Sequence, residues 1–193
     1  MLKKDLRLLY REKRTRITAE NIRQQSEVIA SRLCGWLTFQ PGIRCIHSFL
    51  PSEDKKEVDT FVAIRKIHRE FPLIKITVPK IGKGDRVLSH HIFEASAGFA
   101  NNRWGIPEPV DSAEVPVAEI DAVIVPLLIF DKSGHRVGYG GGFYDTFLAA
   151  CRTDTLKVGL CLFNPVETIS DTGPHDIRLD LCITPERTWD FGD

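Results

Sequence analysis

Several features that would mark a specialised class of protein are scarce or missing in this sequence of 193 residues. Its five cysteines are odd in number and scattered, and none forms a C-x-x-C pair, which argues against a disulfide framework and a zinc site. The longest apolar run, AVIVPLLIF, is far shorter than the ~20 residues that a membrane helix needs. No apolar segment follows the basic N-terminus, so it does not resemble a signal peptide. We therefore expect a reduced, cytoplasmic protein that does not enter a membrane.

Net charge is missing as well, because the formal charge at pH 7 is zero. The balance is uneven, since residues 1–16 carry seven basic and two acidic side chains and the rest of the chain is net acidic. A basic arm on a neutral body indicates an anionic small ligand or a nucleic-acid contact. The length supports one substantial core and is marginal for two. We expect a single domain over residues 1–193.

Apolar runs alternate with helical patterns along the chain, which predicts an α/β domain around a largely parallel sheet. Helices are expected over residues 3–14, after a cap at Thr18, and from an entry near Glu57. Strands are expected over residues 43–50, 73–79, 86–93, 120–130, 156–163 and 176–184. Segment 120–130 is nearly all apolar, as is typical of a strand covered by helices on both faces. Residues 94–119 are expected to be loop-rich.

The stretch GHRVGYGGGFYDTFL, residues 134–148, lies between the most apolar strand and a predicted helix. Glycine permits positive φ and close approach to the backbone, and N–H groups at a helix N-terminus attract anions. Ligands of α/β folds bind at the carboxyl ends of strands, where this stretch lies. A phosphate site is one interpretation. A flexible connector is the other, because the stretch matches neither the P-loop nor the dinucleotide-binding pattern.

Two charged residues favour the phosphate interpretation. Arg136 is suited to donate charge-assisted hydrogen bonds to phosphate. Asp145 is suited to hold a divalent cation that bridges phosphate oxygens, although a carboxylate in the first turn of a helix is also favoured by the helix dipole alone. The six histidines show no metal-binding spacing, and none is assigned to catalysis.

The same stretch resembles the hallmark of the 5-formyltetrahydrofolate cyclo-ligase family, also called 5,10-methenyltetrahydrofolate synthetases. In that family a strand ends in proline and FD, followed by G-x-R-[LV]-G-x-G-x-G-[FY]-Y-D, which matches this chain from Pro126 through Asp131 to Asp145. Five further features come in the family's order: a basic N-terminal helix, EVDT (57–60), VPK (78–80), WGIPEP (104–109) and HDIRLDLCITP (175–185). The resemblance covers essentially the whole chain.

This resemblance implies a three-layer α/β/α sandwich, similar to the sugar-phosphate isomerase and CoA-transferase group. It also implies an ATP-dependent carbon–nitrogen ligase of one-carbon metabolism that uses Mg²⁺. Such an enzyme converts 5-formyltetrahydrofolate to 5,10-methenyltetrahydrofolate with release of ADP and phosphate, through a phosphorylated N5-formyl intermediate. Positioning and charge neutralisation would carry most of such a transfer. Its partners would be these small molecules, and we expect a monomer.

The resemblance assigns roles residue by residue. Catalytic roles fall on Arg136 and Tyr144, and magnesium would be bound by Asp145 and Asp180. ATP would contact Lys3, Lys4, Asp5, Leu6, Arg7, Arg136, Val137, Gly138, Tyr139, Gly140, Gly141, Gly142, Phe143 and Tyr144. The folate would contact Ser52, Glu57, Trp104, Tyr139, Gly140, Gly141, Gly142 and Phe143. Family members often carry a cation where this chain has Tyr139 and Gly141, and Lys80 would meet phosphate or the glutamate tail of the folate.

Simpler roles remain open for several of these residues. Glu57 would suit a helix start, Trp104 a core position and Tyr144 simple packing. Two other functions are also open: a different ATP-using phosphotransferase or ligase with the same loop, and a nucleic-acid-binding module that uses the basic arm. The first would not need Glu57 and Trp104. The second predicts more basic stripes than a net acidic body offers.

Overall fold

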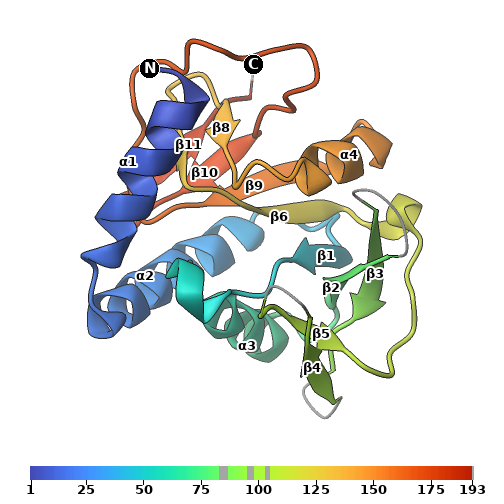
Figure 1. Cartoon of the computed structure of the whole chain (residues 1–193). Helices are drawn as coiled ribbons and strands as arrows, with labels where there is room; N and C mark the ends of the chain where they lie inside the picture. The colour runs from blue at the N-terminus through green and yellow to red at the C-terminus, as the bar shows by residue number, and fades with distance from the viewer. Residues whose placement is uncertain (83–86, 95–97, 103–104, 193) are drawn as a thin grey trace.

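The structure is a computed structural model that describes residues 1–82, 87–94, 98–102 and 105–192. Within these residues, seven strands form one sheet in the order β11-β10-β9-β6-β1-β2-β3 (Figure 1). The strands are β1 (Cys45–Ser48), β2 (Lys75–Ile81), β3 (Leu88–Ile92), β6 (Ala122–Pro126), β9 (Leu156–Leu160), β10 (Leu181–Ile183) and β11 (Thr188–Asp190). The inner strands pair in parallel, and the edge strands β3 and β11 run antiparallel. The predicted α/β class with a largely parallel sheet is confirmed.

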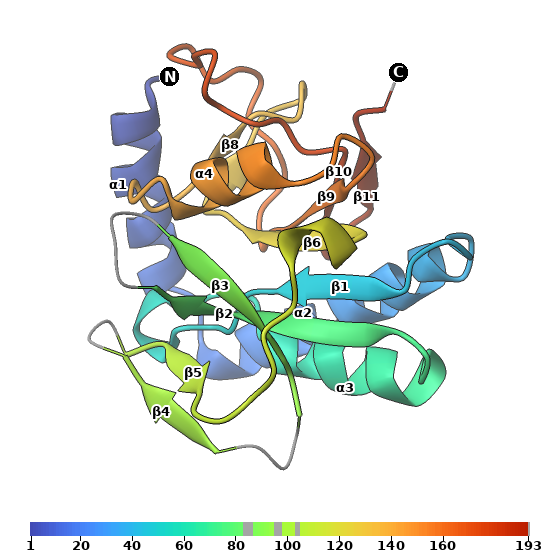
Figure 2. The same ribbon diagram turned by 90° about the vertical axis from the view of Figure 1, so that its right-hand side faces the viewer.

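Helices lie on both faces of this sheet. Helices α2 (Ala19–Leu37) and α3 (Thr60–Glu70) pack on one face, while α4 (Phe143–Ala150) lies on the other (Figures 1 and 2). Thr18 caps α2 as predicted, since its side chain accepts a hydrogen bond from the Asn21 N–H. Helix α3 begins at Thr60 rather than near Glu57, because the Asp59 side chain accepts from the Phe61 N–H and so ends the preceding turn.

The two faces of β6 show why its sequence is almost entirely apolar. Ala122 and Ile124 pack in the core shared with α2 and α3. Val123 and Val125 alternate with them and pack in the core shared with α4. Because successive side chains of a strand point to opposite faces, a central strand covered on both sides must be apolar at every position.

The predicted strand 120–130 is wrong in its extent, because strand β6 ends at Pro126, which lacks the N–H that a longer ladder needs. The apolar run then continues as a separate hairpin of β7 (Ile129–Phe130) and β8 (Arg136–Val137). Asp131 forms the turn of this hairpin, with Oδ1 accepting from the backbone N–H groups of Ser133 and His135, both at 3.0 Å. The hairpin brings Val137 back beside Leu128, whose N–H donates to the Val137 carbonyl at 2.8 Å, so the glycine stretch follows β8 rather than the central strand.

Short elements account for the other differences from the sequence-based assignment. A hairpin of β4 (Phe99–Asn101) and β5 (Pro107–Pro109) lies within the segment expected to be loop-rich. The strand expected over 176–184 is only β10, and β11 was not predicted. Single-turn 3₁₀ helices occur at η1 (Glu53–Lys55) and η2 (Val117–Glu119). Elements of three residues carry too little periodicity to be found from sequence.

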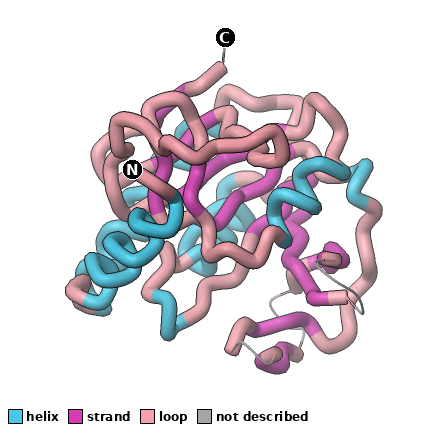
Figure 3. Tube along the Cα trace, turned by 45° about the horizontal axis from the view of Figure 1, so that its top comes forward, coloured by secondary structure: helices cyan, strands magenta, loops and turns pink. Residues whose placement is uncertain are grey.

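Helix α1 (Lys3–Thr15) packs against the β7–β8 hairpin rather than against the sheet itself. Leu6 and Tyr10 on its inner side meet Leu128, Ile129 and Val137 in a separate small core. A long loop after β9 passes beside the start of α1, at the end of the molecule that Figure 3 shows covered mostly by loops. There the backbone N–H of Lys3 donates to Asp171 Oδ1 at 2.7 Å. In the described part of the chain, no helix combines the length and apolarity needed to cross a bilayer.

Candidate active site

The order of strands identifies one edge of the sheet as the natural ligand site. From β1 the chain continues to β2 on one side, and it later returns to β6 on the other side of β1. From β6 the chain goes on to β9, on the side away from β1. The connections after β1 and β6 therefore run in opposite directions, which opens a crevice beyond the carboxyl ends of these two strands. Pro126 ends β6 at this edge, and both the loop after β1 and the glycine stretch meet there.

A cavity of ≈ 190 Å³ lies beside the glycine stretch at this edge. It is lined by Lys3, Arg7, Pro126, Arg136, Gly138, Tyr139, Gly140, Gly141, Gly142, Phe143, Tyr144, Asp145 and Asp176. We call it the glycine-loop cavity. Three of these residues are cations and two are carboxylates, a balance suited to a polyanion that arrives with a divalent cation.

Helix α1 supplies two of the cations by its periodicity. Lys3 and Arg7 are four residues apart, so they share one face, which is turned toward the loop. Arg7 Nε donates to the Gly138 carbonyl at 3.0 Å, and one turn further Arg11 Nη2 donates to the Tyr139 carbonyl at 3.2 Å. These bonds attach the loop to α1 and fix the position of both.

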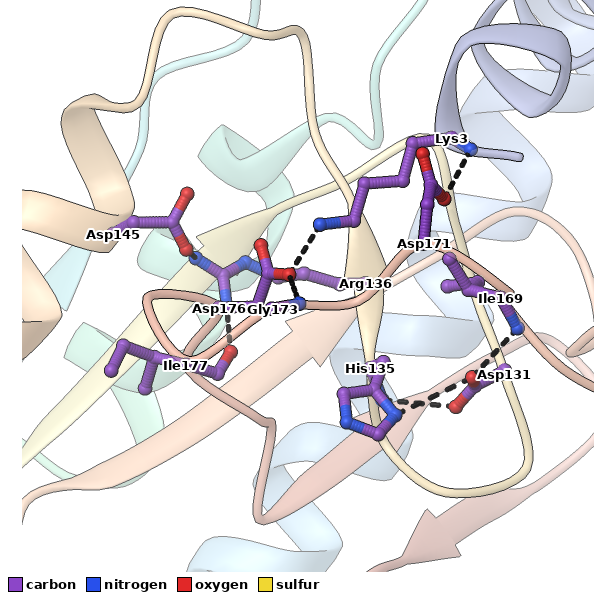
Figure 4. Close-up of polar contacts among 10 residues, drawn as sticks. All are labelled: Lys3, Asp131, His135, Arg136, Asp145, Ile169, Asp171, Gly173, Asp176 and Ile177. Atoms are coloured by element: carbon purple, nitrogen blue, oxygen red, sulfur yellow. Dashed lines mark hydrogen bonds and ion pairs between the residues drawn. The ribbon is translucent and has the colours of Figure 1, made fainter.

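Arg136 is the centre of the charged cluster in this cavity (Figure 4). Its guanidinium, only 8% exposed, donates to Asp145 Oδ1 at 2.7 Å and to the Ile177 carbonyl. Asp176 forms an ion pair with Lys3 beside it. Burial lowers the pKa of Arg136, and the charges of Asp145 and Asp176 act in the opposite direction. The cavity thus holds two carboxylates, each in an ion pair with a cation. A bound phosphate could pair with these cations in place of the carboxylates.

The backbone of the loop shows which glycines are required for conformation. Gly140 and Gly142 have φ of 96° and 74°, in the left-handed region that other residues rarely adopt. Gly142 is also the N-cap of α4, whose first N–H groups therefore face the cavity. Gly138 has no such conformation, and a Cβ built on it would meet nothing within 4 Å. Because Gly138 has no side chain, the space beside the cavity stays open.

Two alanine substitutions separate conformation from ligand approach. Gly140→Ala is expected to lower the free energy of unfolding by about 1–2 kcal/mol, because a Cβ is strained at positive φ. Gly138→Ala is expected to melt like the parent, yet to weaken ATP binding by about tenfold or more, because its methyl group occupies space that phosphate would use. Melting temperatures and ATP titrations of both variants, with Gly42→Ala as a control in an equally open position, check this. Full ATP affinity in Gly138→Ala would show that the loop is a connector.

A second, mostly apolar cavity of ≈ 130 Å³ adjoins the first. We call it the apolar cavity. Pro126, Tyr139, Phe143 and Tyr144 line both cavities, so the two spaces share these side chains as a common boundary. Glu57, from the loop after β1, contributes a carboxylate to the apolar cavity.

Glu57 is held in place by its own loop. It is 7% exposed, and its Oε2 accepts from the Ser52 backbone N–H at 2.8 Å. Ser52 itself is buried and does not line the apolar cavity, but it lines a larger open pocket of ≈ 690 Å³ that Glu57 lines as well. Glu57 lines the apolar cavity together with Tyr139 and Tyr144. Burial raises the pKa of both tyrosines, and the charge of Glu57 raises it further. Trp104, the third expected folate contact, lies outside the described residues.

Two buried histidines, His47 and His90, lie next to Tyr144 on the side of the sheet. The His47 Nε2 lies 3.4 Å from the Tyr144 hydroxyl, and His90 Nδ1 lies 3.3 Å from His47 Nδ1. Burial lowers the pKa of His47 and lowers that of His90 to about 4. Burial also raises the pKa of Tyr144. The three groups are therefore neutral at pH 7, and the sequence, which shows only isolated histidines, does not reveal this arrangement.

Some residues assigned from the resemblance do not reach either cavity. Lys4 is exposed on α1, and Asp5 lines neither space. Leu6 and Val137 are fully buried in the core between α1 and the hairpin. Helical and strand periodicity explain this, because neighbours of Lys3, Arg7 and Arg136 must point elsewhere.

Asp180 is also placed apart from Asp145, contrary to the expected metal pair. Its Oδ2 accepts from the Lys157 backbone N–H at 2.7 Å and from Lys157 Nζ at 3.3 Å. Lys157 lies at the amino end of β9, the edge of the sheet opposite to Pro126. Asp176, four residues earlier in the same HDIRLD motif, lines the glycine-loop cavity instead. The sequence signal for Asp176 was present, but it did not distinguish the two aspartates.

An open, mostly parallel α/β sheet with a cationic glycine loop at its switch point defines a class of phosphate-binding α/β proteins. Comparison with known proteins identifies the family within this class. Residues 1–185 match the model of the 5-formyltetrahydrofolate cyclo-ligase family. The chain therefore belongs to the 5-formyltetrahydrofolate cyclo-ligase family.

Individual relatives agree with this assignment. A probable 5-formyltetrahydrofolate cyclo-ligase of Schizosaccharomyces pombe is 30% identical over 159 residues, which is 74% of each chain. The 5-formyltetrahydrofolate cyclo-ligase of Escherichia coli K12 is 27% identical over 190 residues, 95% of this chain and 100% of that one. The NMR structure of Aquifex aeolicus 5,10-methenyltetrahydrofolate synthetase superposes with a TM-score of 0.84 at 28% identity, covering 100% of this chain and 94% of that chain.

Proposed function

We propose that this protein catalyses the family reaction at the wall between the two cavities, with ATP in the glycine-loop cavity and 5-formyltetrahydrofolate in the apolar cavity. The family reaction is the ATP-dependent conversion of 5-formyltetrahydrofolate to 5,10-methenyltetrahydrofolate. The observation that carries the proposal is the shared wall of Pro126, Tyr139, Phe143 and Tyr144. Because these four residues line both cavities, a phosphate in one cavity and a formyl oxygen in the other would approach each other beside the same side chains.

The chemistry requires such an approach. The formyl oxygen attacks the γ-phosphorus of ATP and ADP leaves, which turns a poor leaving group into phosphate. N10 then attacks the activated carbon and loses its proton, and the bond from carbon to the phosphorylated oxygen breaks. Transfer of this kind depends on positioning and on neutralisation of the phosphate charge. Lys3, Arg7 and Arg136 would neutralise that charge, and Tyr144, held by His47, would position the reacting groups.

The cavity also fits a magnesium ion. Asp145, bonded to Arg136, and Asp176, paired with Lys3, both line this cavity, and carboxylate oxygens are the protein ligands that Mg²⁺ prefers. Among the described residues, no group of three or more metal-ligating side chains occurs, so phosphate oxygens and water would complete the shell. When bound there, Mg²⁺ would neutralise charge on the phosphates. Arg136 would then be released from Asp145 to donate to the transferring phosphate.

Glu57 would recognise the pterin, whose amino and ring N–H groups suit a carboxylate acceptor. Glu57→Gln is expected to raise the KM for the folate by about tenfold or more, because a charge-assisted hydrogen bond is lost, with little change in the KM for ATP. The glutamine retains an acceptor for the Ser52 N–H, so the loop should stay folded. Initial rates with each substrate varied in turn check this, with the exposed Glu27→Gln as control. An equal rise of both KM values would indicate a folding role.

The function itself is tested with the purified protein, 5-formyltetrahydrofolate, ATP and Mg²⁺. The methenyl product has an absorbance in the near ultraviolet that the substrate lacks, and ADP is measured in the same sample. We expect product and ADP to form in equal amounts, and neither to form without ATP. Hydrolysis of ATP that does not depend on the folate would favour a different ATP-using enzyme.

A further inference from the structure

Three polar residues are buried side by side on the face of the sheet that α4 covers. They are His47 of β1, Thr77 of β2 and His90 of β3. The strand ladders pair His47 with Thr77, and His90 with Pro79. Because residues 77 and 79 of one strand point to the same face, the three polar side chains are neighbours on that face. A cluster of this kind in a core must satisfy its polar atoms from within the protein.

Helix α4 covers the two histidines with aromatic rings. The ring centre of Phe147 lies 4.8 Å from that of His47 and 4.1 Å from that of His90. Tyr144, one turn earlier on the same helix, brings its hydroxyl to 3.4 Å from His47 Nε2. Tyr144 also lines both the glycine-loop cavity and the apolar cavity. The polar cluster is therefore connected to the proposed site through one hydroxyl group.

The polar contacts of His47 form a chain that ends at this hydroxyl. On the side away from Tyr144, His47 Nδ1 lies 3.3 Å from His90 Nδ1 and 3.4 Å from Thr77 Oγ1. Burial lowers the pKa of both histidines, so each ring is neutral at pH 7 and has one N–H donor and one acceptor nitrogen. In a neutral imidazole, the partner of one nitrogen determines what the other nitrogen can do.

Two arrangements of protons satisfy these contacts. In the first, His47 Nδ1–H donates to His90, and His47 Nε2 accepts from the Tyr144 hydroxyl, whose proton then points away from the cavities. In the second, His90 Nδ1–H and the Thr77 hydroxyl donate to His47 Nδ1, and His47 Nε2–H donates to the Tyr144 oxygen. The Tyr144 proton is then free to point into the cavities.

The proposed ligand distinguishes between these arrangements. A phosphate group presents strong acceptor oxygens, so a neutral tyrosine beside it stabilises it by donating its proton. Tyr144 can do so only when it accepts from His47 rather than donates to it. The second arrangement is therefore the one that suits phosphate transfer at the shared wall.

We propose that His90 and His47 are positioning residues, which hold the Tyr144 hydroxyl with its proton directed at the transferred phosphate. This rests on the proposed function, since the phosphate would lie in the glycine-loop cavity that Tyr144 lines. A donor fixed in this direction before the reaction stabilises charge that develops on the phosphate oxygens without having to reorient. The two histidines act only through Tyr144, and neither touches the substrates.

Kinetic coupling between His47 and Tyr144 tests this role. Tyr144→Phe is expected to lower kcat by about 100-fold, the effect of losing one donor to the developing charge. His47→Leu should lower kcat by about tenfold in the parent, but by less than about twofold in the Tyr144→Phe background, because no hydroxyl remains to be positioned. The KM values for ATP and the folate should change by less than about threefold, since the interaction is made in the transition state.

Three further variants separate positioning from packing. In His47→Gln the amide can donate from the place of Nε2, so kcat should return to within about threefold of the parent. His90→Leu should lower kcat by only about threefold, because Thr77 remains as a donor to His47 Nδ1. His91→Leu, the same change at the next residue of β3, whose side chain points to the other face and bonds to Ser89, is the matched control and should leave kcat unchanged.

The tautomers themselves are measured by nitrogen-15 NMR of the imidazole rings, because protonated and unprotonated ring nitrogens have separate chemical shifts. The sample is the parent protein with the Mg²⁺ complex of a non-hydrolysable ATP analogue, and the signals of each histidine are identified by their loss in His47→Gln and His90→Leu. We expect the proton of His47 on Nε2 and that of His90 on Nδ1. A proton of His47 on Nδ1 would overturn the proposal.

The kinetic outcomes are equally decisive. If His47→Leu lowers kcat by the same factor with and without the Tyr144 hydroxyl, His47 is a packing residue and the proposal is wrong. An unchanged kcat in His47→Leu would overturn it as well. Should His47→Leu fail to fold, the losses expected for His90→Leu and the tautomers of the parent still decide the matter. Absence of turnover in the parent would instead overturn the proposed function.

Discussion

Replacing Arg136 with alanine is expected to lower kcat/KM for ATP by a factor that corresponds to roughly 2–4 kcal/mol of transition-state stabilisation. This is the effect of losing a charge donor aimed at a transferring phosphate. Its guanidinium is buried and bound to Asp145 at 2.7 Å, so alanine also leaves Asp145 and Asp176 without the cation that separates their charges. Because the interaction with the transferring phosphate is made in the transition state, kcat should fall as well, and the loss of rate should persist at saturating ATP. Initial rates at several ATP and Mg²⁺ concentrations measure it.

Loss of stability must be separated from loss of catalysis in this variant. Arg136→Lys retains a positive charge but loses the planar fork, and it should recover only part of the activity. Arg23→Ala removes an exposed arginine on α2 that pairs with Glu20, and it should leave kcat/KM unchanged. A folded Arg136→Ala protein, judged by its melting temperature, that turns over at nearly the parent rate would remove Arg136 from the site.

Asp145→Asn is expected to lower turnover by about 100-fold or more, because an uncharged amide is a weak ligand for a hard cation. Asp145 lies in the first turn of α4 with its side chain 40% exposed, so the helix should lose only about 0.3–1 kcal/mol of dipole stabilisation. Binding of the folate should persist, since Asp145 does not line the apolar cavity. Turnover against Mg²⁺ concentration, with folate binding measured separately, checks both statements.

Two further aspartates make this experiment specific. Asp176→Asn should reproduce the loss, since Asp176 lies in the same cavity. Asp180→Asn should retain turnover and lose some stability, because it weakens the contacts to Lys157 at the far edge of the sheet. If Asp180→Asn were the inactive variant and Asp176→Asn the active one, our assignment of the metal ligands would be wrong.

The sequence by itself determined the class of fold and indicated the phosphate chemistry that we propose for the glycine stretch. Strand and helix periodicity are local properties, and the apolar run before Pro126 can only suit a strand buried on both faces. The glycines, Arg136 and Asp145 lie within ten residues of one another along the chain, so their juxtaposition needed no tertiary information. The order of short motifs was sufficient to indicate the family.

Contacts between distant segments were decided by the tertiary structure alone. The sequence could not show that α1 binds the glycine loop through Arg7 and Arg11, since 131 residues separate Arg7 from Gly138. Nor could it show that Glu57 shares a cavity with Tyr139 and Tyr144, or that His47 and His90 meet beside Phe147 of α4. Such pairs are fixed by strand order, which brings the ends of β1 and β6 side by side.

The two aspartates of HDIRLD illustrate the limit most clearly. Asp176 and Asp180 share one motif, but four residues of extended chain span up to ~13 Å, enough to reach from one edge of a short sheet toward the other. Asp176 therefore pairs with Lys3 in the glycine-loop cavity, while Asp180 pairs with Lys157 at the amino end of β9. The resemblance to the family had assigned a metal-binding role in this motif to Asp180. The path of the backbone across the sheet places Asp176, and not Asp180, in the lining of the glycine-loop cavity.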